Sequence, residues 1–274
     1  MKNYFLLLTL IFLFSCKRTT KQASTDTAAN SKSIEKSNPL IAKFRPLLQG
    51  TWVKKAYIDK VTETKSPMAT IDEASGITIF TIDTTEMTDN VITVHAGWNN
   101  HEGGDITLSF KAGKRPSSIT FGEGELSVAV NHGDTVLTVY YPGVKNKIKA
   151  YQFIRANGQK IMAVNEGFDR AVNKALMIGR YTLLDTATSQ PVVFNINGNV
   201  TGFKDFKTYS VLVDLNMEPM DNLDEISFVS DKKIYRSYSF KFDSDTLKLY
   251  DTKPNADSSL LMLDKLKYKL VKLK

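Results

Sequence analysis

The sequence is short of the residues on which most enzymes and metal proteins depend. Its single cysteine, Cys16, excludes a disulfide within the chain and a thiolate-rich metal site. Its three histidines, His95, His101 and His132, include no pair at metal-ligand spacing, and no Gly-x-Ser-x-Gly motif or glycine-rich phosphate loop occurs. We therefore expect no catalytic residue, no metal and no cofactor. A hydrolase would need histidines and carboxylates to converge in a cleft, and the sequence does not show such an arrangement.

A strong bias toward charge of one sign is also missing. The chain has 36 Lys and Arg against 29 Asp and Glu, a formal net charge of +7, and basic residues stand among acids, as Lys204 does beside Asp205. Nucleic-acid-binding proteins instead gather basic and aromatic residues on one face, so we expect no nucleic-acid partner. Hydrophobic residues at 42% and charged residues at 24% are typical of an ordinary globular body.

Long hydrophobic runs are absent, and the one apolar stretch lies at the N-terminus. It covers residues 4–14, follows Lys2, and suits a signal peptide better than a transmembrane helix. It ends in Leu13-Phe14-Ser15-Cys16, which resembles the lipobox of bacterial lipoproteins, with Phe14 where a small residue is commonest. The resemblance implies a signal peptide over residues 1–15 and acyl chains, such as palmitate, on Cys16, which is enough for stable membrane anchoring. The alternative is an ordinary signal peptide followed by an incidental cysteine.

The residues after Cys16 bear on location. Lys17 and Arg18 follow directly, without the acidic residue that holds known lipoproteins at the inner membrane. The resemblance therefore implies a lipid-anchored protein of the outer membrane, facing either the periplasm or the cell surface. Residues 16–40 contain few large apolar side chains, so we expect a lipidated, flexible tether.

The next segment, residues 41–160, has the pattern of an antiparallel sheet. A short helix is expected over Pro39–Leu48, ending near Pro46, and a strand over Trp52–Ile58. Further strands follow at short intervals, and one of them alternates strictly between apolar and polar residues, as expected for a sheet with one wet face. Gly103-Gly104 and Asn131-His132-Gly133-Asp134 predict tight turns, so the strands form a meander.

The second half repeats the landmarks of the first. Apolar residues over 166–178 have helical spacing and end before Gly179, which predicts a linker helix over 161–178 and a second unit over 179–274. Three short stretches recur in the same order, which suggests two copies of one all-β unit: Gly50-Thr51-Trp52 matches Gly179-Arg180-Tyr181, residues 134–140 match 245–250, and Tyr151 to Arg155 match Tyr268 to Lys272. Chance similarity between degenerate strand patterns is the alternative.

A glycine, any residue and a tryptophan on the first strand, followed by a meander and a cation on the last strand, resemble lipocalin-like barrels. The resemblance implies that Gly50, Trp52 and Arg155 close the barrel, with Arg155 stacked on Trp52, and that Lys272 and Tyr181 form a weaker equivalent. The expected fold is therefore all-β, with two antiparallel meander units in tandem, each a barrel or half-barrel, joined by a short helix.

Such a barrel either fills its interior or encloses a small-ligand cavity. We expect Tyr57, His95, Trp98 and Tyr140 to line such a cavity, with Trp98 near an open end. The expected function is a lipid-anchored envelope protein that binds a small apolar or amphipathic ligand. The alternative is a non-catalytic structural or assembly partner of outer-membrane proteins, with filled barrels and an exposed apolar patch.

Overall fold

The computed structural model describes residues 38–143, 147–184, 190–214 and 219–274. Cys16, the expected signal peptide and most of the expected tether lie outside these residues. The described chain begins at Asn38, whose side chain accepts a hydrogen bond from the Leu40 backbone N–H at 3.0 Å and so caps the first helix. In the described part of the chain, no helix is both long enough and apolar enough to cross a membrane.

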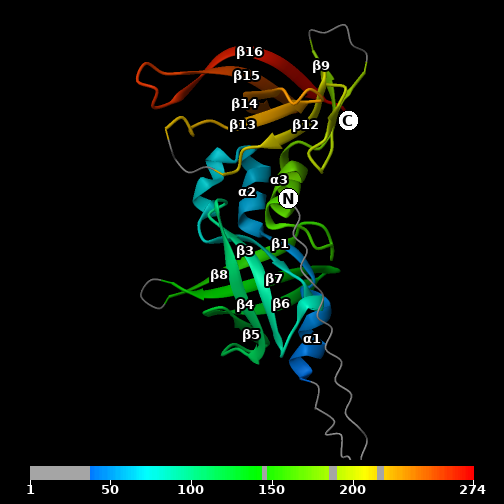
Figure 1. The fold of residues 1–274 in the computed structure, drawn as a ribbon, viewed down its shortest axis with the longest axis vertical. Coiled ribbons are helices and arrows are strands. Elements are labelled where there is room, and N and C mark those ends of the chain that lie inside the picture. The colour runs from blue at the N-terminus through cyan, green and yellow to red at the C-terminus, as the bar shows by residue number, and fades with distance from the viewer. Residues whose placement is uncertain (1–37, 144–146, 185–189, 215–218) are drawn as a thin grey trace, which may run out of the picture. The chain divides into compact units, whose positions relative to one another are not determined.

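The first half of the chain forms a closed barrel of eight antiparallel strands, β1 to β8 (Figure 1). Each strand pairs with the next, and β1 also pairs with β8, so Trp52 lies opposite both Phe80 and Arg155. Closure satisfies the backbone groups that an edge strand would leave free. The elements are α1 (Pro39–Leu48), β1 (Gly50–Lys54), α2 (Lys55–Thr64), η1 (Met68–Ala74), β2 (Ile77–Ile82), η2 (Thr84–Glu86), β3 (Val91–Trp98), β4 (Glu102–Ala112), β5 (Ser118–Phe121), β6 (Gly124–Asn131), β7 (Asp134–Pro142) and β8 (Ile148–Arg155).

The second half repeats this plan after helix α3. Its eight strands run in the order β11-β10-β9-β16-β15-β14-β13-β12, so the first strand again pairs with the last. The sheet nearly closes, because the Tyr209 N–H donates to the Gly198 carbonyl at 2.7 Å and Asn199 bridges to Thr208. The elements are α3 (Val164–Leu176), β9 (Gly179–Leu183), β10 (Val192–Phe194), β11 (Val200–Thr201), β12 (Phe206–Val211), β13 (Glu225–Ser230), β14 (Tyr235–Asp243), β15 (Thr246–Pro254) and β16 (Leu261–Lys272).

This architecture confirms the predicted fold class: two antiparallel eight-stranded units in tandem, joined by a short helix. The first unit is a closed barrel and the second is almost one, and both are consistent with a lipocalin-like fold. The turn predicted at Asn131-His132-Gly133-Asp134 also forms, at His132 and Gly133.

The two interiors are filled largely by aromatic rings. In the first barrel, Phe80 is fully buried and its ring centre lies 4.6 Å from that of Phe153 and 5.3 Å from that of Phe121. In the second, Phe228 contacts a ring of partners whose centres lie 5.1 to 6.2 Å away: Phe194, Phe203, Phe206 and Tyr238. Such rings bury large apolar areas and supply most of the stabilisation of each core.

Helices α2 and α3 pack against one another outside the first barrel (Figure 1). The Tyr57 ring of α2 lies 5.2 Å from the Phe168 ring of α3, and both side chains are buried. Val61 and Val172 join the same core, which continues into the interior of the second sheet. The apolar face of each helix is thereby covered.

The structure corrects three predictions of local structure. The strand expected over Trp52–Ile58 ends at Lys54, where α2 begins, because Tyr57 and Val61 lie one helical turn apart and bury the same face. Helix α1 runs through Pro46 to Leu48 instead of ending near Pro46. Gly103 and Gly104 lie inside β4, and the turn before them is made by Asn99 and Asn100, both with positive φ.

Candidate ligand-binding site at the open end of the first barrel

One end of the first barrel is sealed by Trp52 and Arg155. The Arg155 guanidinium carbon lies 4.6 Å from the centre of the Trp52 ring, which is fully buried. The same guanidinium donates to the Leu47 carbonyl at 2.6 Å and to the Gln49 carbonyl at 3.3 Å, so it also satisfies backbone groups at the end of α1. Position 50, beside this closure, requires glycine, since its φ is +134° and an added Cβ would lie 2.9 Å from the Gly158 carbonyl oxygen.

The second sheet has an equivalent closure. Lys272 lies opposite Tyr181 in the strand register, and its Nζ atom is 5.8 Å from the centre of the Tyr181 ring. The Tyr181 hydroxyl donates to the Met177 carbonyl at 3.0 Å, just as Trp52 Nε1 donates to the Leu48 carbonyl at 2.8 Å. In both cases the acceptor lies four residues earlier, so the two closures are structurally equivalent.

A pocket of about 350 Å³ opens between the ends of β2, β3, β7 and β8. Its deepest residues are Val139 and Phe153, both fully buried in the barrel core. Trp98, Tyr141 and Tyr151 form aromatic walls and belong to the margin of the same core. Lys149, Tyr151 and Phe153 alternate along β8, so all three face this pocket, and the strand continues from it to Arg155 at the sealed end.

The pocket walls also offer polar groups. Burial, with a smaller contribution from Glu123, raises the pKa of Tyr141 to about 12, so its hydroxyl keeps its proton at neutral pH and can donate a hydrogen bond. Lys149 is exposed at the edge of the pocket. An apolar interior with a few polar groups near the opening is the usual composition of a small-molecule site.

A buried cation lies behind the Tyr151 wall. Lys54 is only 2% exposed, and its Nζ atom is 4.8 Å from the centre of the Tyr151 ring. The ammonium donates to the carbonyls of Glu73 at 2.7 Å and Ser75 at 3.2 Å and lies 3.5 Å from the Glu73 carboxylate. Burial lowers the pKa of Lys54, although Glu73 opposes this effect. The hydrogens of the Lys54 ammonium thus have partners, and the side chain packs against Tyr151 instead of extending into solvent.

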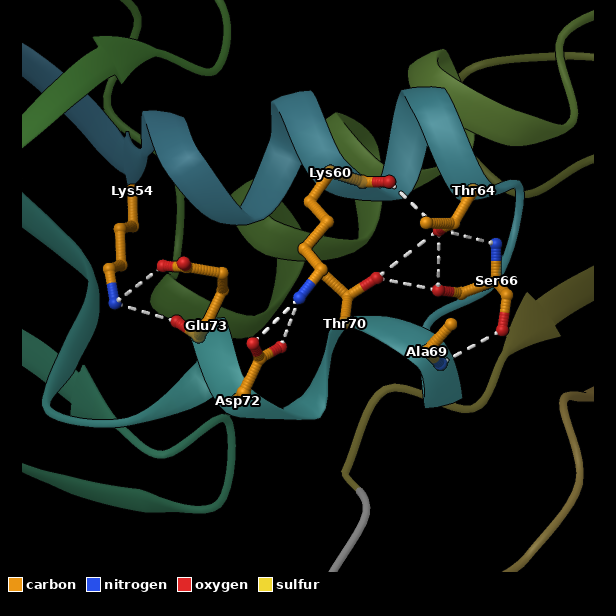
Figure 2. A network of polar contacts seen from close by, with 8 residues as sticks. All are labelled: Lys54, Lys60, Thr64, Ser66, Ala69, Thr70, Asp72 and Glu73. Atoms are coloured by element: carbon orange, nitrogen blue, oxygen red, sulfur yellow. Dashed lines mark hydrogen bonds and ion pairs between the residues drawn. The ribbon is translucent and has the colours of Figure 1, made fainter.

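These contacts belong to a polar network that ties η1 to α2 and β1 (Figure 2). The Lys60 ammonium donates to both carboxylate oxygens of Asp72, at 2.5 and 2.7 Å, and thereby lowers the pKa of Asp72. Farther along, the Thr70 hydroxyl donates to the Ser66 carbonyl at 2.6 Å. The network therefore holds the segment that leads directly into Gly76 and Ile77, two residues of the pocket.

Of the four residues expected to line a cavity, the structure places one, Trp98, in this pocket. His95 is on the outer face of β3, 61% exposed in its side chain, with Nδ1 2.7 Å from Asp105 on the neighbouring strand. Tyr140 also faces outward from β7 and stacks under Arg115 at 4.6 Å. Tyr57 is buried between α2 and α3, away from the pocket, because the segment after Lys54 is helical.

Sequence reasoning missed most of the pocket. Tyr141, Tyr151 and Phe153 alternate with outward-facing neighbours on β7 and β8, so the period of two could have assigned them to the interior. No comparable pattern links Lys54 to Glu73, which is 19 residues away on a 3₁₀ helix that the sequence did not predict.

Comparison with family models, curated proteins and solved structures finds no match for this chain. Among the described residues, no three side chains of His, Cys, Asp or Glu are grouped so that they could hold a metal ion. The site is therefore interpreted from its own geometry.

Proposed function

We propose that this chain is a lipid-anchored protein of the outer membrane that binds a small apolar or amphipathic ligand at the open end of its first barrel, without catalysing a reaction on it. The observation that carries the proposal is the pocket of about 350 Å³ between Trp98, Tyr141 and Tyr151, with Val139 and Phe153 at its base. The sealed opposite end makes this pocket a dead end rather than a channel, as ligand storage or transport requires.

The pocket's polarity favours one orientation of an amphipathic ligand. The apolar part would contact Phe153 and Val139, since no charged residue lies among the buried base residues. The polar part would lie near the Tyr141 hydroxyl and Lys149. The positive charge of Lys149 on that side favours an acidic head group over a basic one.

The test uses the fact that the chain has two tryptophans. Trp98 lines the pocket, whereas Trp52 lies at the sealed end under Arg155. The probe is 10-bromodecanoate, because bromine quenches tryptophan emission on contact. We expect saturable quenching in the unaltered protein and in Trp52→Phe, and loss of most of that quenching in Trp98→Phe. 1-Decanol, which lacks the carboxylate, should compete more weakly than decanoate.

Two results would contradict the binding proposal. One is quenching that does not saturate, and the other is quenching that survives in Trp98→Phe as fully as in the unaltered protein. If Trp52→Phe folds poorly, the comparison of Trp98→Phe with the unaltered protein still decides the location, because only Trp98 lines the pocket.

Membrane attachment is tested separately. If Cys16 carries acyl chains, cells supplied with radiolabelled palmitate should label the protein, and the label and its outer-membrane fractionation should be lost in Cys16→Ser. A Cys16→Ser protein that still fractionates with the outer membrane would refute lipid anchoring. That result would not bear on the ligand site.

A second candidate function rests on exposed apolar side chains of the second sheet. Tyr235 on β14 is 69% exposed, and Leu260, Met262 and Leu266 on or beside β16 are also exposed. Such side chains favour contact with an envelope protein. Crosslinking from a photoreactive residue at position 262, compared with position 207 on β12, tests this candidate, which predicts a discrete crosslinked product only at 262.

A further inference from the structure

The two units correspond not only at their sealed ends but also at their opposite ends. Tyr151 lies four residues before Arg155 on β8, and Tyr268 lies four residues before Lys272 on β16. Each tyrosine pairs with the matching position of the preceding strand, Val139 and Leu249 respectively. Tyr151 and Tyr268 are therefore structural equivalents, each on the last strand of its unit.

A pocket of about 400 Å³ lies beside Tyr268, between β15 and β16 and residues of β12, β13 and β14, whereas the first pocket lies between β7 and β8 and the ends of β2 and β3. Tyr268 and Tyr238 lie at its base, with their ring centres 5.6 Å apart in an edge-to-face arrangement. As in the first unit, a lysine stacks on the equivalent tyrosine, because Lys204 Nζ lies 4.9 Å from the centre of the Tyr268 ring. The tyrosine is thus repeated, whereas the lysine stacked on it comes from β1 in the first unit and from the segment between β11 and β12 in the second.

The lining of this second pocket differs from that of the first in charge. Three cations, Lys204, Arg236 and Lys267, face two carboxylates, Asp205 and Asp251. Lys267 lies 3.6 Å from Asp251, so these two charges offset one another. Within the described part of the chain, neither Lys204 nor Arg236 forms an ion pair, and both side chains are exposed, so they stay available to a ligand.

Neutral hydrogen-bonding groups complete this lining. Ser230 and Ser237 supply hydroxyls, and Tyr238 adds a phenol whose pKa is influenced by both Asp251 and Arg236. Burial raises the pKa of Tyr238, with further contributions from Tyr268, with which the phenol forms a hydrogen bond, and from Asp251, so the phenol keeps its proton at neutral pH. A guanidinium, an ammonium and hydroxyl donors around one cavity match the acceptors of an oxyanion.

We propose that the open end of the second unit is a second binding site, which takes the carboxylate or phosphate group of a small anionic ligand between Lys204 and Arg236. The site is independent of the apolar pocket in the first barrel. The chain would thus have two sites, one beside Tyr151 that selects apolar surface and one beside the equivalent Tyr268 that selects negative charge.

Calorimetric titration of the full chain at low ionic strength tests this proposal, with inorganic phosphate and citrate as probes. Arg236→Gln is expected to weaken binding by about tenfold or more, since a charge-assisted hydrogen bond is lost, and Lys204→Gln by a smaller factor. Lys207→Gln is the matched control. It removes the same charge from β12, where Lys207 pairs with Asp231 at 3.3 Å outside the pocket, and should leave binding unchanged.

The proposal is overturned if neither anion binds the unaltered protein at millimolar concentration, or if Lys207→Gln weakens binding as much as Arg236→Gln does. Quenching by 10-bromodecanoate should be the same in Arg236→Gln as in the unaltered protein, so failure of this site and failure of the first are distinguishable.

The anionic group can belong to a soluble molecule or to a lipid head group. Sedimentation with neutral phosphatidylcholine vesicles and with vesicles containing phosphatidylglycerol separates these sources, because an acyl anchor binds both kinds. Extra sedimentation with the anionic vesicles, lost in Arg236→Gln, supports the site with a lipid head group as its ligand. Equal sedimentation together with calorimetric binding supports the site with a soluble anion.

Discussion

The guanidinium carbon of Arg155 lies 4.6 Å from the centre of the Trp52 ring, while two of its nitrogens donate to backbone carbonyls at the end of α1. One side chain therefore joins the last strand, the first strand and the preceding helix. The equivalent pair in the second unit, Lys272 and Tyr181, keeps the stacking at 5.8 Å. The shorter contact and the added hydrogen bonds of Arg155 predict that the first sealed end contributes more to stability than the second.

Arg155→Met should destabilise the protein by about 2–4 kcal/mol, because the cation–π contact and two charge-assisted hydrogen bonds are lost. Lys272→Met, its counterpart in the second unit, should cost about 1 kcal/mol or less, since its contact is longer and exposed. Urea denaturation followed by circular dichroism measures both. Equal losses of unfolding free energy in the two variants would show that stacking geometry does not determine how much each pair stabilises the protein.

Lys54→Met should destabilise the protein by about 2–4 kcal/mol, because the carbonyls of Glu73 and Ser75 lose a buried donor. Lys60→Met is the control, since the pair between Lys60 and Asp72 is largely exposed and should contribute little. Quenching by 10-bromodecanoate should weaken in Lys54→Met alone, because only Lys54 fixes the Tyr151 wall. A larger loss of stability in Lys60→Met than in Lys54→Met would contradict the role of Lys54 as the more important buried donor.

Burial, with a smaller contribution from Asp245, raises the pKa of Tyr181 to about 12, above the value of about 10 expected in the unfolded chain. The folded state then holds a proton that the unfolded state releases, so this contribution to stability is complete below pH 10 and is lost as the pH rises toward 12. Tyr181→Phe should cost about 1 kcal/mol at pH 7, where the bond to the Met177 carbonyl is lost.

Above pH 10 that cost should shrink, because phenylalanine has no proton to release. Urea midpoints measured from pH 7 to pH 11.5 for both proteins test this expectation. Parallel pH profiles for the two proteins would show that Tyr181 does not contribute to the alkaline loss of stability.

Gly104→Ala should disturb the first pocket, because an added Cβ would lie 3.1 Å from Cζ3 of Trp98 and force the ring to move by a few tenths of an ångström. We expect a shifted Trp98 emission maximum and several-fold weaker quenching by 10-bromodecanoate. Gly103→Ala is the neighbouring control, since the nearest atom to its added Cβ is 4.0 Å away. Identical binding in both variants would argue against Trp98 as a pocket wall.

The sequence predicted the fold class because strand alternation and turn residues are local patterns. The match between residues 151–155 and 268–272 also identified equivalent strands, as the pairing of Trp52 with Arg155 and of Tyr181 with Lys272 demonstrates. Both closing cations therefore lie where the resemblance placed them.

Prediction from sequence did less well where tertiary contacts decide the outcome. Tyr57 suits a strand by propensity, yet it lies in a helix because Phe168, more than a hundred residues away, covers its ring. His95 lies on a strand as expected, but the barrel register turns it outward toward Asp105. The pocket depends on four strand ends that meet only after closure, so its composition was not visible in any single stretch.

The seam between β11 and β12 has a consequence for the chain's tendency to aggregate. β11 has only two residues and β12 has six, and they are joined by a bridge between Asn199 and Thr208 and a hydrogen bond from the Tyr209 N–H to the Gly198 carbonyl, both at residues just before β11. If heat or mechanical load parts this seam, β12 presents a free strand edge to other molecules, whereas the fully paired first barrel presents none. Intermolecular strand pairing would then begin at Phe206–Val211, and charged substitutions on that strand would suppress it.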